Sequence, residues 1–241
     1  MNENSGGKDN QTHERAGGDR VTTLFLHLVI RDLGDPFTAF RNKFKDLTEE
    51  SNPWVLRENL AELTDSVFRL DRVVRDLVDT AAIEAGSIRL KTEPVDLASV
   101  LSDRISRRLR RMRGYRFQPE MPPHTPPIQG DKSRLTILID DLFDVVILLS
   151  PGGGTILVHL SMDENEVRIS AQNRSANIPA GSSDSFLEWL RESLQEGNSL
   201  KGVGIGLYRS YLTAQMMGGR MDLEAPPEGG VSITVRFPYI K

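Results

Sequence analysis

The chain has 241 residues and a formal net charge of −4, and 38% of its residues are hydrophobic. This length exceeds the roughly 100–150 residues of a usual single domain, so we expect two compact units. The sequence contains no cysteine, which excludes disulfides, thiol catalysis and cysteine-ligated metal centres. The four histidines form no ligand-like pair and the net charge gives no general attraction for nucleic acid, so neither a metal site nor a nucleic-acid partner is expected.

The N-terminal segment is polar. Residues 1–18 are rich in glycine and show no hydrophobic periodicity, so we expect a disordered tail there. No apolar run approaches the roughly 18–20 residues needed to span a bilayer, and the N-terminus lacks the apolar stretch of a signal peptide. We therefore expect no membrane span and a cytoplasmic location.

Residues 19–86 carry the periodicity of two long helices. The first extends from about Arg20 to Leu47 and contains Pro36, which bends a helix. Residues 51–53 break the pattern, and a heptad seam follows with alternating spacings of four and three. The seam consists of Leu56, Leu60, Leu63, Val67, Leu70, Val74, Leu77 and Ala81. One helix hairpin leaves much of such a seam exposed, so pairing of two hairpins into a four-helix bundle, and hence a homodimer, is expected.

Residues 87–241 alternate between strand and helix patterns, which makes the whole chain α+β. The pattern predicts an α/β sandwich with helices on one face of a mixed sheet. The expected strands cover 87–96, 115–122, 155–162, 166–173, 220–225 and 231–238. The expected helices cover 97–113, 131–149 and 184–196, and a last one follows a glycine-rich turn.

Three stretches resemble sensor histidine kinases, in the order found in that family. Residues 69–101 resemble the segment that ends the dimerization hairpin and enters the ATP-binding domain. Residues 131–158 resemble the N box and its following turn, and residues 202–238 resemble the G2 region and the closing strands. The resemblance implies a dimerization and phosphotransfer-like hairpin over 19–86 and a GHKL-type ATP-binding domain over 87–241.

The stretch RDLGDPFTAF resembles the family's acceptor motif, in which a phosphorylated histidine precedes a proline by five places. Pro36 sets the register and puts Arg31 at the acceptor position. A guanidinium that stays protonated cannot attack a γ-phosphate, so no catalytic residue is expected there. His27 lies one turn earlier and is the alternative acceptor, although it has no adjacent acid. Its other interpretation is packing at a helix interface.

The ATP-binding boxes also depart from the family pattern. The two N-box asparagines correspond to Asp141 and Val145, and the phosphate-facing basic residue corresponds to Leu148. Valine offers no oxygen to Mg²⁺. The G1 box, normally Asp-x-Gly-x-Gly, begins at Asn173 and lacks the adenine-reading carboxylate, which is worth about 1.5–3 kcal/mol. The resemblance therefore implies that ATP and Mg²⁺ bind weakly or not at all.

Two further features each have two interpretations. Gly202, Gly204 and Gly206 precede a helix and can present backbone N–H groups to a phosphate, as a vestigial cofactor site, or they serve packing alone. In one interpretation, the arginine-rich run from Arg104 to Arg116 binds nucleic acid, an anionic membrane surface or an acidic partner. In the simpler one it is a solvated helix face.

The functional expectation is a catalytically inactive, histidine-kinase-like dimer, a pseudokinase that acts as scaffold or modulator in a two-component phosphorelay. Its expected partners are a response-regulator receiver domain or a true histidine kinase. The family resemblance places the receiver contacts at Phe37, Phe40 and Arg41, with core packing as the alternative for the two phenylalanines, and at Arg31, whose charge suits an acidic pocket. The rivals are a histidine phosphotransferase that uses His27 and a DNA- or membrane-surface regulator that uses Arg104–Arg116.

Overall fold

The computed structural model describes residues 6–49, 51–110, 114–175, 186–195, 203–224 and 230–239. The chain divides into two compact units, Met1–Val73 and Val74–Lys241. The division lies inside the second long helix, whereas the sequence pattern placed the boundary after residue 86. The last turns of that helix therefore belong with the sheet-containing unit. No helix in the described part of the chain is long and apolar enough to cross a membrane.

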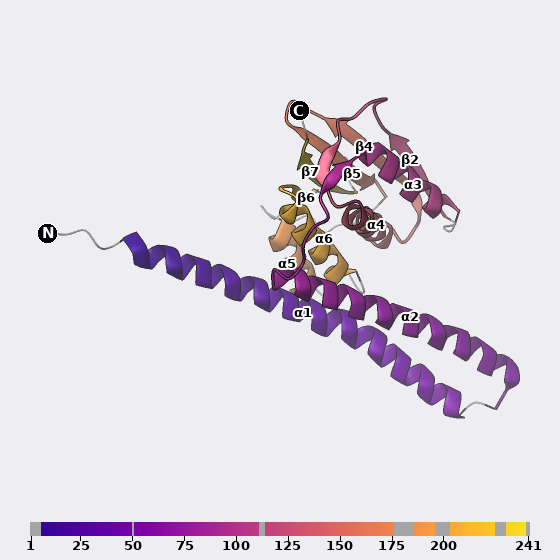
Figure 1. Cartoon of the computed structure of the whole chain (residues 1–241). Helices are drawn as coiled ribbons and strands as arrows, with labels where there is room; N and C mark the ends of the chain where they lie inside the picture. The colour runs from indigo at the N-terminus through magenta and orange to yellow at the C-terminus, as the bar shows by residue number, and fades with distance from the viewer. Residues whose placement is uncertain are drawn as a thin grey trace. The chain divides into compact units, whose positions relative to one another are not determined.

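The first unit contains helix α1 (Gly6–Glu49) and the first part of helix α2 (Pro53–Glu84) (Figure 1). Pro36 lies inside α1, as expected. The Lys43 ammonium lies 2.5 Å from the Glu62 carboxylate, so the two helices run antiparallel and side by side. Asn52 begins α2 by accepting a hydrogen bond from the Trp54 N–H at 3.0 Å, and proline is well suited to the first helical position.

The start of α1 corrects one expectation. Residues 6–18 are helical, so the prediction of a disordered tail over 1–18 is wrong for them, while residues 1–5 lie outside the described residues. The segment contains no proline, and its glutamine, glutamate, arginine and alanine residues have good helix propensities. Low hydrophobicity limits what a segment can bury, but it does not prevent the backbone from continuing a helix that has already formed.

The second unit is built around a five-stranded mixed sheet in the order β2-β4-β5-β7-β6. Its strands are β2 (Tyr115–Glu120), β4 (Gly154–Met162), β5 (Glu166–Asn173), β6 (Arg220–Glu224) and β7 (Val231–Pro238). The β2–β4 pair is parallel and the other pairs are antiparallel. A separate two-stranded sheet pairs β1 (Glu93–Val95) with β3 (Ile128–Gly130). The strand expected over 87–96 is therefore shorter than predicted, and β3 was not predicted.

Helices pack on the sheet and form the core with it (Figure 1). They are α3 (Leu97–Leu109), α4 (Lys132–Leu148), α5 (Phe186–Gln195) and α6 (Gly204–Met216). Along β5 the buried side chains alternate, as Val167, Ile169 and Ala171 do, because one face of the strand lies under the helices. The predicted combination of a mixed sheet and covering helices is confirmed.

Candidate functional site

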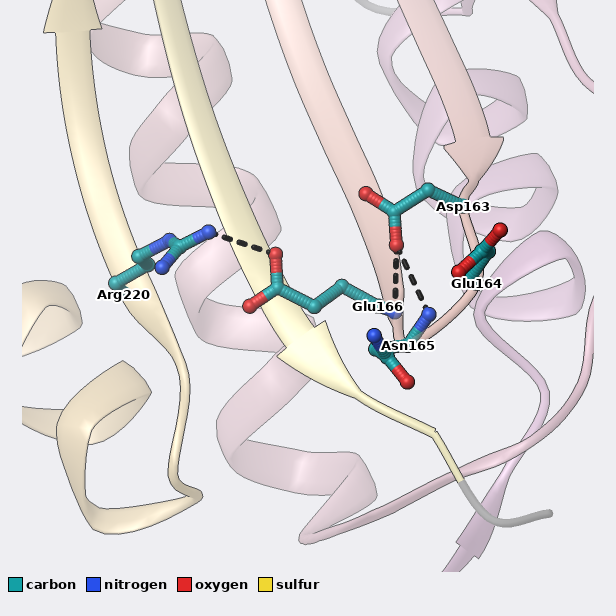
Figure 2. Close-up of a pocket in the computed structure, with 5 residues that line it drawn as sticks. All are labelled: Asp163, Glu164, Asn165, Glu166 and Arg220. Atoms are coloured by element: carbon teal, nitrogen blue, oxygen red, sulfur yellow. Dashed lines mark hydrogen bonds and ion pairs between the residues drawn. The ribbon is translucent and has the colours of Figure 1, made fainter.

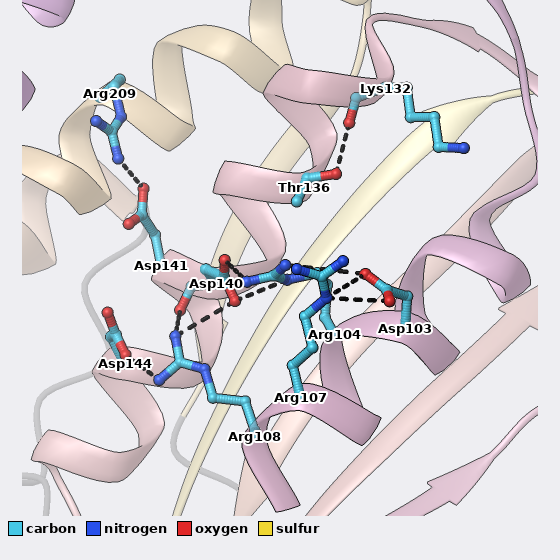
Figure 3. Close-up of polar contacts among 10 residues, drawn as sticks. All are labelled: Asp103, Arg104, Arg107, Arg108, Lys132, Thr136, Asp140, Asp141, Asp144 and Arg209. Carbon is cyan, nitrogen blue, oxygen red and sulfur yellow. Dashed lines mark hydrogen bonds and ion pairs between the residues drawn. The ribbon is translucent and has the colours of Figure 1, made fainter. Parts of the chain in front are cut away.

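The centre of the second unit contains a buried ionic cluster between α2, α4 and α6. The Asp141 carboxylate on α4 accepts a hydrogen bond from Arg209 Nη2 at 2.8 Å and another from Ser210 Oγ at 2.6 Å. The Arg209 guanidinium also pairs through Nη1 with the Asp76 carboxylate on α2. Figure 3 shows Arg209 reaching Asp141 from α6. We call Asp76, Asp141, Arg209 and Ser210 the ionic cluster.

Burial and charge pairing act against each other in the ionic cluster. Burial raises the pKa of Asp141, and it does so although Arg209 and Ser210 favour the charged carboxylate. Burial by itself would lower the pKa of Arg209, but the charges of Asp141 and Asp76 hold that pKa above its ordinary value. Arg209 therefore stays a cation, and its charge is what makes two buried carboxylates tolerable in one place.

Gly206 lies against this cluster in the first turn of α6. A Cβ atom at Gly206 would lie 3.2 Å from Asp141 Oδ1 and 3.4 Å from Asp76 Oδ2, which is close contact with two charged groups. The packing interpretation accounts for this glycine without any phosphate. Gly204 is buried at the start of the same helix, and Gly202 lies outside the described residues.

The other N-box positions do not line an open site. Val145 is completely buried in the core, and Leu148 is half-buried on the same helix. Neither side chain carries an oxygen or a positive charge, so neither can hold Mg²⁺ or a phosphate. Among the described residues, no group of three or more histidine, aspartate or glutamate side chains is arranged to hold a metal ion.

Asn173, at the G1 position, forms side-chain hydrogen bonds to the turn before β4 and to the turn after β5. Its side-chain amide donates to the Gly153 carbonyl at 3.4 Å and accepts from the Ser175 N–H at 2.9 Å. The residue is 1% exposed, and a Cβ atom at Gly154 would lie 3.5 Å from its Oδ1. Asn173 thus fastens the end of β5 to the turn before β4. Residues 176 and 177 of the G1 stretch lie outside the described residues.

The acceptor position lies on α1. Arg31 is half-buried, and its Nε lies 3.4 Å from the carboxylate of Asp32, which is itself buried. His27, one turn earlier, is exposed. Phe37 and Arg41 are exposed one turn apart, and Phe40 is half-buried. Phe37 and Arg41 are thus accessible on one side of α1. The Arg31 guanidinium instead contacts the carboxylate of the next residue, Asp32.

On each helix of the hairpin, apolar residues that are spaced seven positions apart are exposed. On α2, Leu63 and Leu70 are half-buried, while Leu60 and Val67 are 52% and 47% exposed. The exposed line on α1 consists of Ile30, Phe37 and Phe44. In an antiparallel pair the Lys43–Glu62 contact places Phe44 within about one residue of the level of Leu60, and Phe37 within about one residue of the level of Val67. We call Ile30, Phe37, Phe44, Leu60 and Val67 the apolar stripe.

Three arginines of the arginine-rich run are paired within the domain. Arg104 and Arg108 on α3 bind the carboxylates of Asp140 and Asp144 on α4, and Arg107 binds Asp103 at 2.9 Å (Figure 3). The contacts of Arg104 and Arg108 join α3 to α4, so this part of the run is not a free basic patch. Arg110 and Arg116 are exposed, and residues 111–113 lie outside the described residues.

A shallow hollow lies at the turn between β4 and β5, lined by Asp163, Glu164, Asn165, Glu166 and Arg220 (Figure 2). The Asp163 carboxylate accepts the N–H groups of Asn165 and Glu166 at 3.0 and 2.9 Å, and these bonds lower the pKa of Asp163. Glu166 pairs with Arg220 at 2.8 Å. These polar groups are used to stabilise the turn.

The fold matches known kinases. Residues 130–241 match the family described as "Histidine kinase-, DNA gyrase B-, and HSP90-like ATPase". The histidine kinase AdeS of Acinetobacter baumannii superposes with a TM-score of 0.67 at 15% identity, over 88% of this chain and 98% of AdeS. Histidine kinase ThkA, in its complex with response regulator protein TrrA, superposes with a TM-score of 0.69 at 18% identity. The match covers 96% of this chain and 66% of the ThkA chain.

Curated relatives extend the match to the hairpin. Sensor histidine kinase Hik2 of Thermosynechococcus vestitus is 25% identical over 221 residues, covering 88% of this chain and 57% of Hik2. Sensor protein DivL of Caulobacter vibrioides is 25% identical over 231 residues, covering 92% of this chain and 29% of DivL. The chain is thus similar to sensor histidine kinases over both of its units. It spans less than two thirds of the length of these relatives.

The ionic cluster is a feature that the sequence pattern did not reveal. The N-box residue Asp141 was singled out, but its partners Asp76, Arg209 and Ser210 were not. The available signal was weak: Arg209 is a lone charge in the otherwise apolar start of α6, and Asp76 lies one residue before a seam leucine. Only the packing of α2, α4 and α6 brings these residues together.

Proposed function

We propose that this histidine-kinase-like chain is a catalytically inactive signalling module, which acts as a dimeric scaffold or modulator in a two-component phosphorelay. The observation that carries the proposal is the ionic cluster. The N-box carboxylate of Asp141 is committed to Arg209 and Ser210, and Val145 is buried. The oxygen ligands that Mg²⁺ needs beside a nucleotide are therefore missing or already engaged.

Two further departures support the loss of kinase chemistry. Arg31 has no lone pair with which to accept a phosphoryl group. Asn173 directs its side-chain amide to Gly153 and Ser175, and it lacks the charge that strengthens a hydrogen bond to adenine. Calorimetry with ATP and Mg²⁺ tests this part. We expect no low-micromolar binding, and such binding would contradict the proposal.

The apolar stripe supports a homodimer. Rows of exposed apolar side chains on two neighbouring helices are costly in water, and a second hairpin related by a two-fold axis presents the same residues in return. Phe37 against Val67 and Phe44 against Leu60 lie at matching levels, as a four-helix bundle requires. The stripe of one chain is thus complementary to that of its copy.

For the signalling partner, we propose a response-regulator receiver domain or a true histidine kinase, with Phe37, Phe40 and Arg41 as contacts. Phe37 also belongs to the apolar stripe of the proposed homodimer, so the exposed Arg41, one turn further along α1, is the contact that remains accessible and carries the docking proposal. ThkA, which shares this fold, was crystallised with a response regulator. Arg31 contributes less, because it already contacts Asp32.

Binding to receiver domains from the native host tests the docking surface. We expect Arg41→Glu to weaken capture of the cognate receiver at least tenfold, since it reverses the charge at the centre of the proposed contact. Arg116→Glu reverses the charge of an exposed arginine on β2 and serves as the matched control. The docking surface would be refuted if both variants weakened receiver binding equally, or if neither weakened it.

His27 supports a second candidate function, histidine phosphotransfer with a nonfunctional ATP domain. The His27 side chain is exposed. It lies two heptads before Arg41, so both residues are on the same side of α1. An accessible imidazole can take the phosphoryl group from a receiver's aspartyl phosphate and release the carboxylate. A search for phosphohistidine after mixing with phosphorylated receivers tests this function, with His27→Asn as the control. The DNA- or membrane-surface alternative is weaker, because Arg104, Arg107 and Arg108 are paired.

A further inference from the structure

In the described part of the chain, helices pack on one face of the five-stranded sheet, and the other face carries three neighbouring arginines. The strand registers place Arg168 of β5 opposite Arg236 of β7, and Arg236 opposite Arg220 of β6. All three positions alternate with buried core residues, so the three side chains leave the sheet on the same face. Neighbouring strands lie about 4.8 Å apart, so three positive charges are held close together. We call Arg168, Arg220 and Arg236 the arginine row.

The arginine row is a site of like-charge repulsion. Like charges that face each other on neighbouring strands destabilise a sheet. Burial and the charges of Arg168 and Arg220 together lower the pKa of Arg236, although Glu166 and Asp163 act to raise it. An anion placed beside the row therefore relieves an unfavourable arrangement.

Carboxylates of the chain satisfy the arginine row only in part. Each arginine contacts one carboxylate, in the pairs Arg236–Asp222, Arg220–Glu166 and Arg168–Asp163. The last pair is the longest, because Arg168 Nη2 lies 3.6 Å from Asp163 Oδ2, which is beyond a good hydrogen bond. The buried Nε of Arg168 has no hydrogen-bond partner among the described residues. Arg168 thus has N–H donors to offer to a further anion.

The hollow at the β4–β5 turn adjoins the arginine row, because Arg220 is one of its lining residues (Figure 2). Its volume is about 460 Å³, which is the size of a small-molecule site. The turn uses Oδ1 of Asp163 for both of its N–H contacts, so Oδ2 is not engaged by the turn. Carboxylates such as Glu164 and amides such as Asn165 accept hydrogen bonds from hydroxyl groups. The hollow therefore places hydroxyl acceptors next to the donors of the row.

We propose that the arginine row and the hollow form a binding site for a small phosphorylated polyol, such as a sugar phosphate. The phosphate group accepts hydrogen bonds from Arg168 and Arg220, since a guanidinium matches phosphate in charge and geometry. The hydroxyl groups donate to the carboxylates of the hollow. A ligand with both kinds of group explains why arginines and carboxylates occur together, because the carboxylates alone repel a simple anion. This inference does not depend on the proposed signalling role.

Calorimetry on the full chain at low ionic strength tests the class of ligand. The probe is glucose 6-phosphate, and glucose and inorganic phosphate are the two comparison ligands. We expect glucose 6-phosphate to bind at least about tenfold more tightly than either, because only it engages both the row and the hollow. No binding of glucose 6-phosphate overturns the proposal, and so does equal affinity for inorganic phosphate or for glucose.

Variants of the arginine row test the location. Arg168 and Arg220 are 42% and 62% exposed, so we expect Arg168→Gln/Arg220→Gln to fold and to bind glucose 6-phosphate at least about tenfold more weakly. Arg116→Gln is the matched control, because Arg116 is an exposed arginine on β2, at the other edge of the same sheet. If the double variant does not fold, Arg220→Gln takes its place. Unchanged binding in the row variant, or equal loss in the control, overturns the proposal.

Discussion

The Arg209 guanidinium donates to the Asp141 carboxylate at 2.8 Å in the interior of the second unit, where the two side chains are 8% and 6% exposed. In the family pattern that the sequence resembles, the position of Asp141 faces a nucleotide. In this chain its carboxylate faces an arginine of the same domain. A position associated with ligand binding has thus become part of the core.

The stability of the second unit is predicted to depend on this pair. Arg209→Met leaves Asp76 and Asp141 buried without their cation, so we expect the free energy of unfolding to fall by about 3–5 kcal/mol. Arg107→Met removes only an exposed pair with Asp103 and should cost about 0.5 kcal/mol or less. Urea unfolding followed by circular dichroism measures both. A similar decrease in the free energy of unfolding in both variants would show that the buried pair contributes no more to stability than the exposed pair.

The apolar stripe predicts which substitutions separate a dimer and which unfold the hairpin. Leu60→Asp/Val67→Asp places charges on the exposed line, so we expect folded, helical monomers. Leu63→Asp/Leu70→Asp places them on the line that faces α1, so we expect loss of helical signal as well. Arg69→Asp, at an exposed position off the stripe, should change neither property.

Light scattering and circular dichroism at micromolar concentration distinguish these variants. A wild-type protein that is monomeric under those conditions would contradict the homodimer. Unfolding of Leu60→Asp/Val67→Asp would show instead that the stripe is part of the hairpin's own core.

Arg31→His separates the two causes of the proposed inactivity. The substitution supplies an imidazole at the acceptor position, next to Asp32 and in register with Pro36. We expect no labelling by ATP and Mg²⁺ alone, because Val145 and Asn173 leave the nucleotide and its metal without ligands. We do expect transfer from a phosphorylated cognate receiver, which needs only a nucleophilic imidazole and a docked partner.

The measurement compares phosphohistidine formed under these two conditions, in a background where His27 is replaced by asparagine. Labelling from ATP alone would show that the ATP domain is competent. No transfer from any cognate receiver would count against the docking surface.

The start of α4 predicts a pH dependence. The Asp131 carboxylate caps the helix: burial raises its pKa, but hydrogen bonds from the N–H groups of Lys91, Arg134 and Ser133 outweigh burial and hold the pKa below its ordinary value. Since the folded-state pKa is depressed, the stabilising contribution is complete above the unfolded-state pKa of about 4. It is lost as the pH falls through the folded-state pKa.

Asp131→Ala should therefore lower the free energy of unfolding by about 1 kcal/mol at neutral pH. Asp131→Asn keeps a capping oxygen without a titrating charge, so it should lose less stability than the wild type between about pH 5 and pH 2. Parallel acid titrations of unfolding check this. Identical slopes in the wild type and Asp131→Asn would rule out Asp131 as a contributor.

Local sequence patterns were sufficient for the elements whose side chains repeat with a clear period. The seam from Leu56 to Ala81 predicted α2, and the alternation in β5 and β7 predicted the sheet, because burial on one face imposes that period directly on the sequence. The polar start of α1 was mispredicted, since helix propensity extends the backbone where no burial pattern exists. The short strand β3 was missed because three residues are too few to show any period.

The sequence by itself indicated the resemblance to sensor histidine kinases, the order of most elements and the residue types at the positions that correspond to the acceptor and the N box. Only the tertiary structure decided what those replacements contact. Asp76 and Arg209 are far apart along the chain, yet they meet in the ionic cluster, and Arg104 and Arg108 reach Asp140 and Asp144 across two helices. Charge pairing of this kind depends on distance and burial in space, which a pattern of neighbours along the chain does not encode.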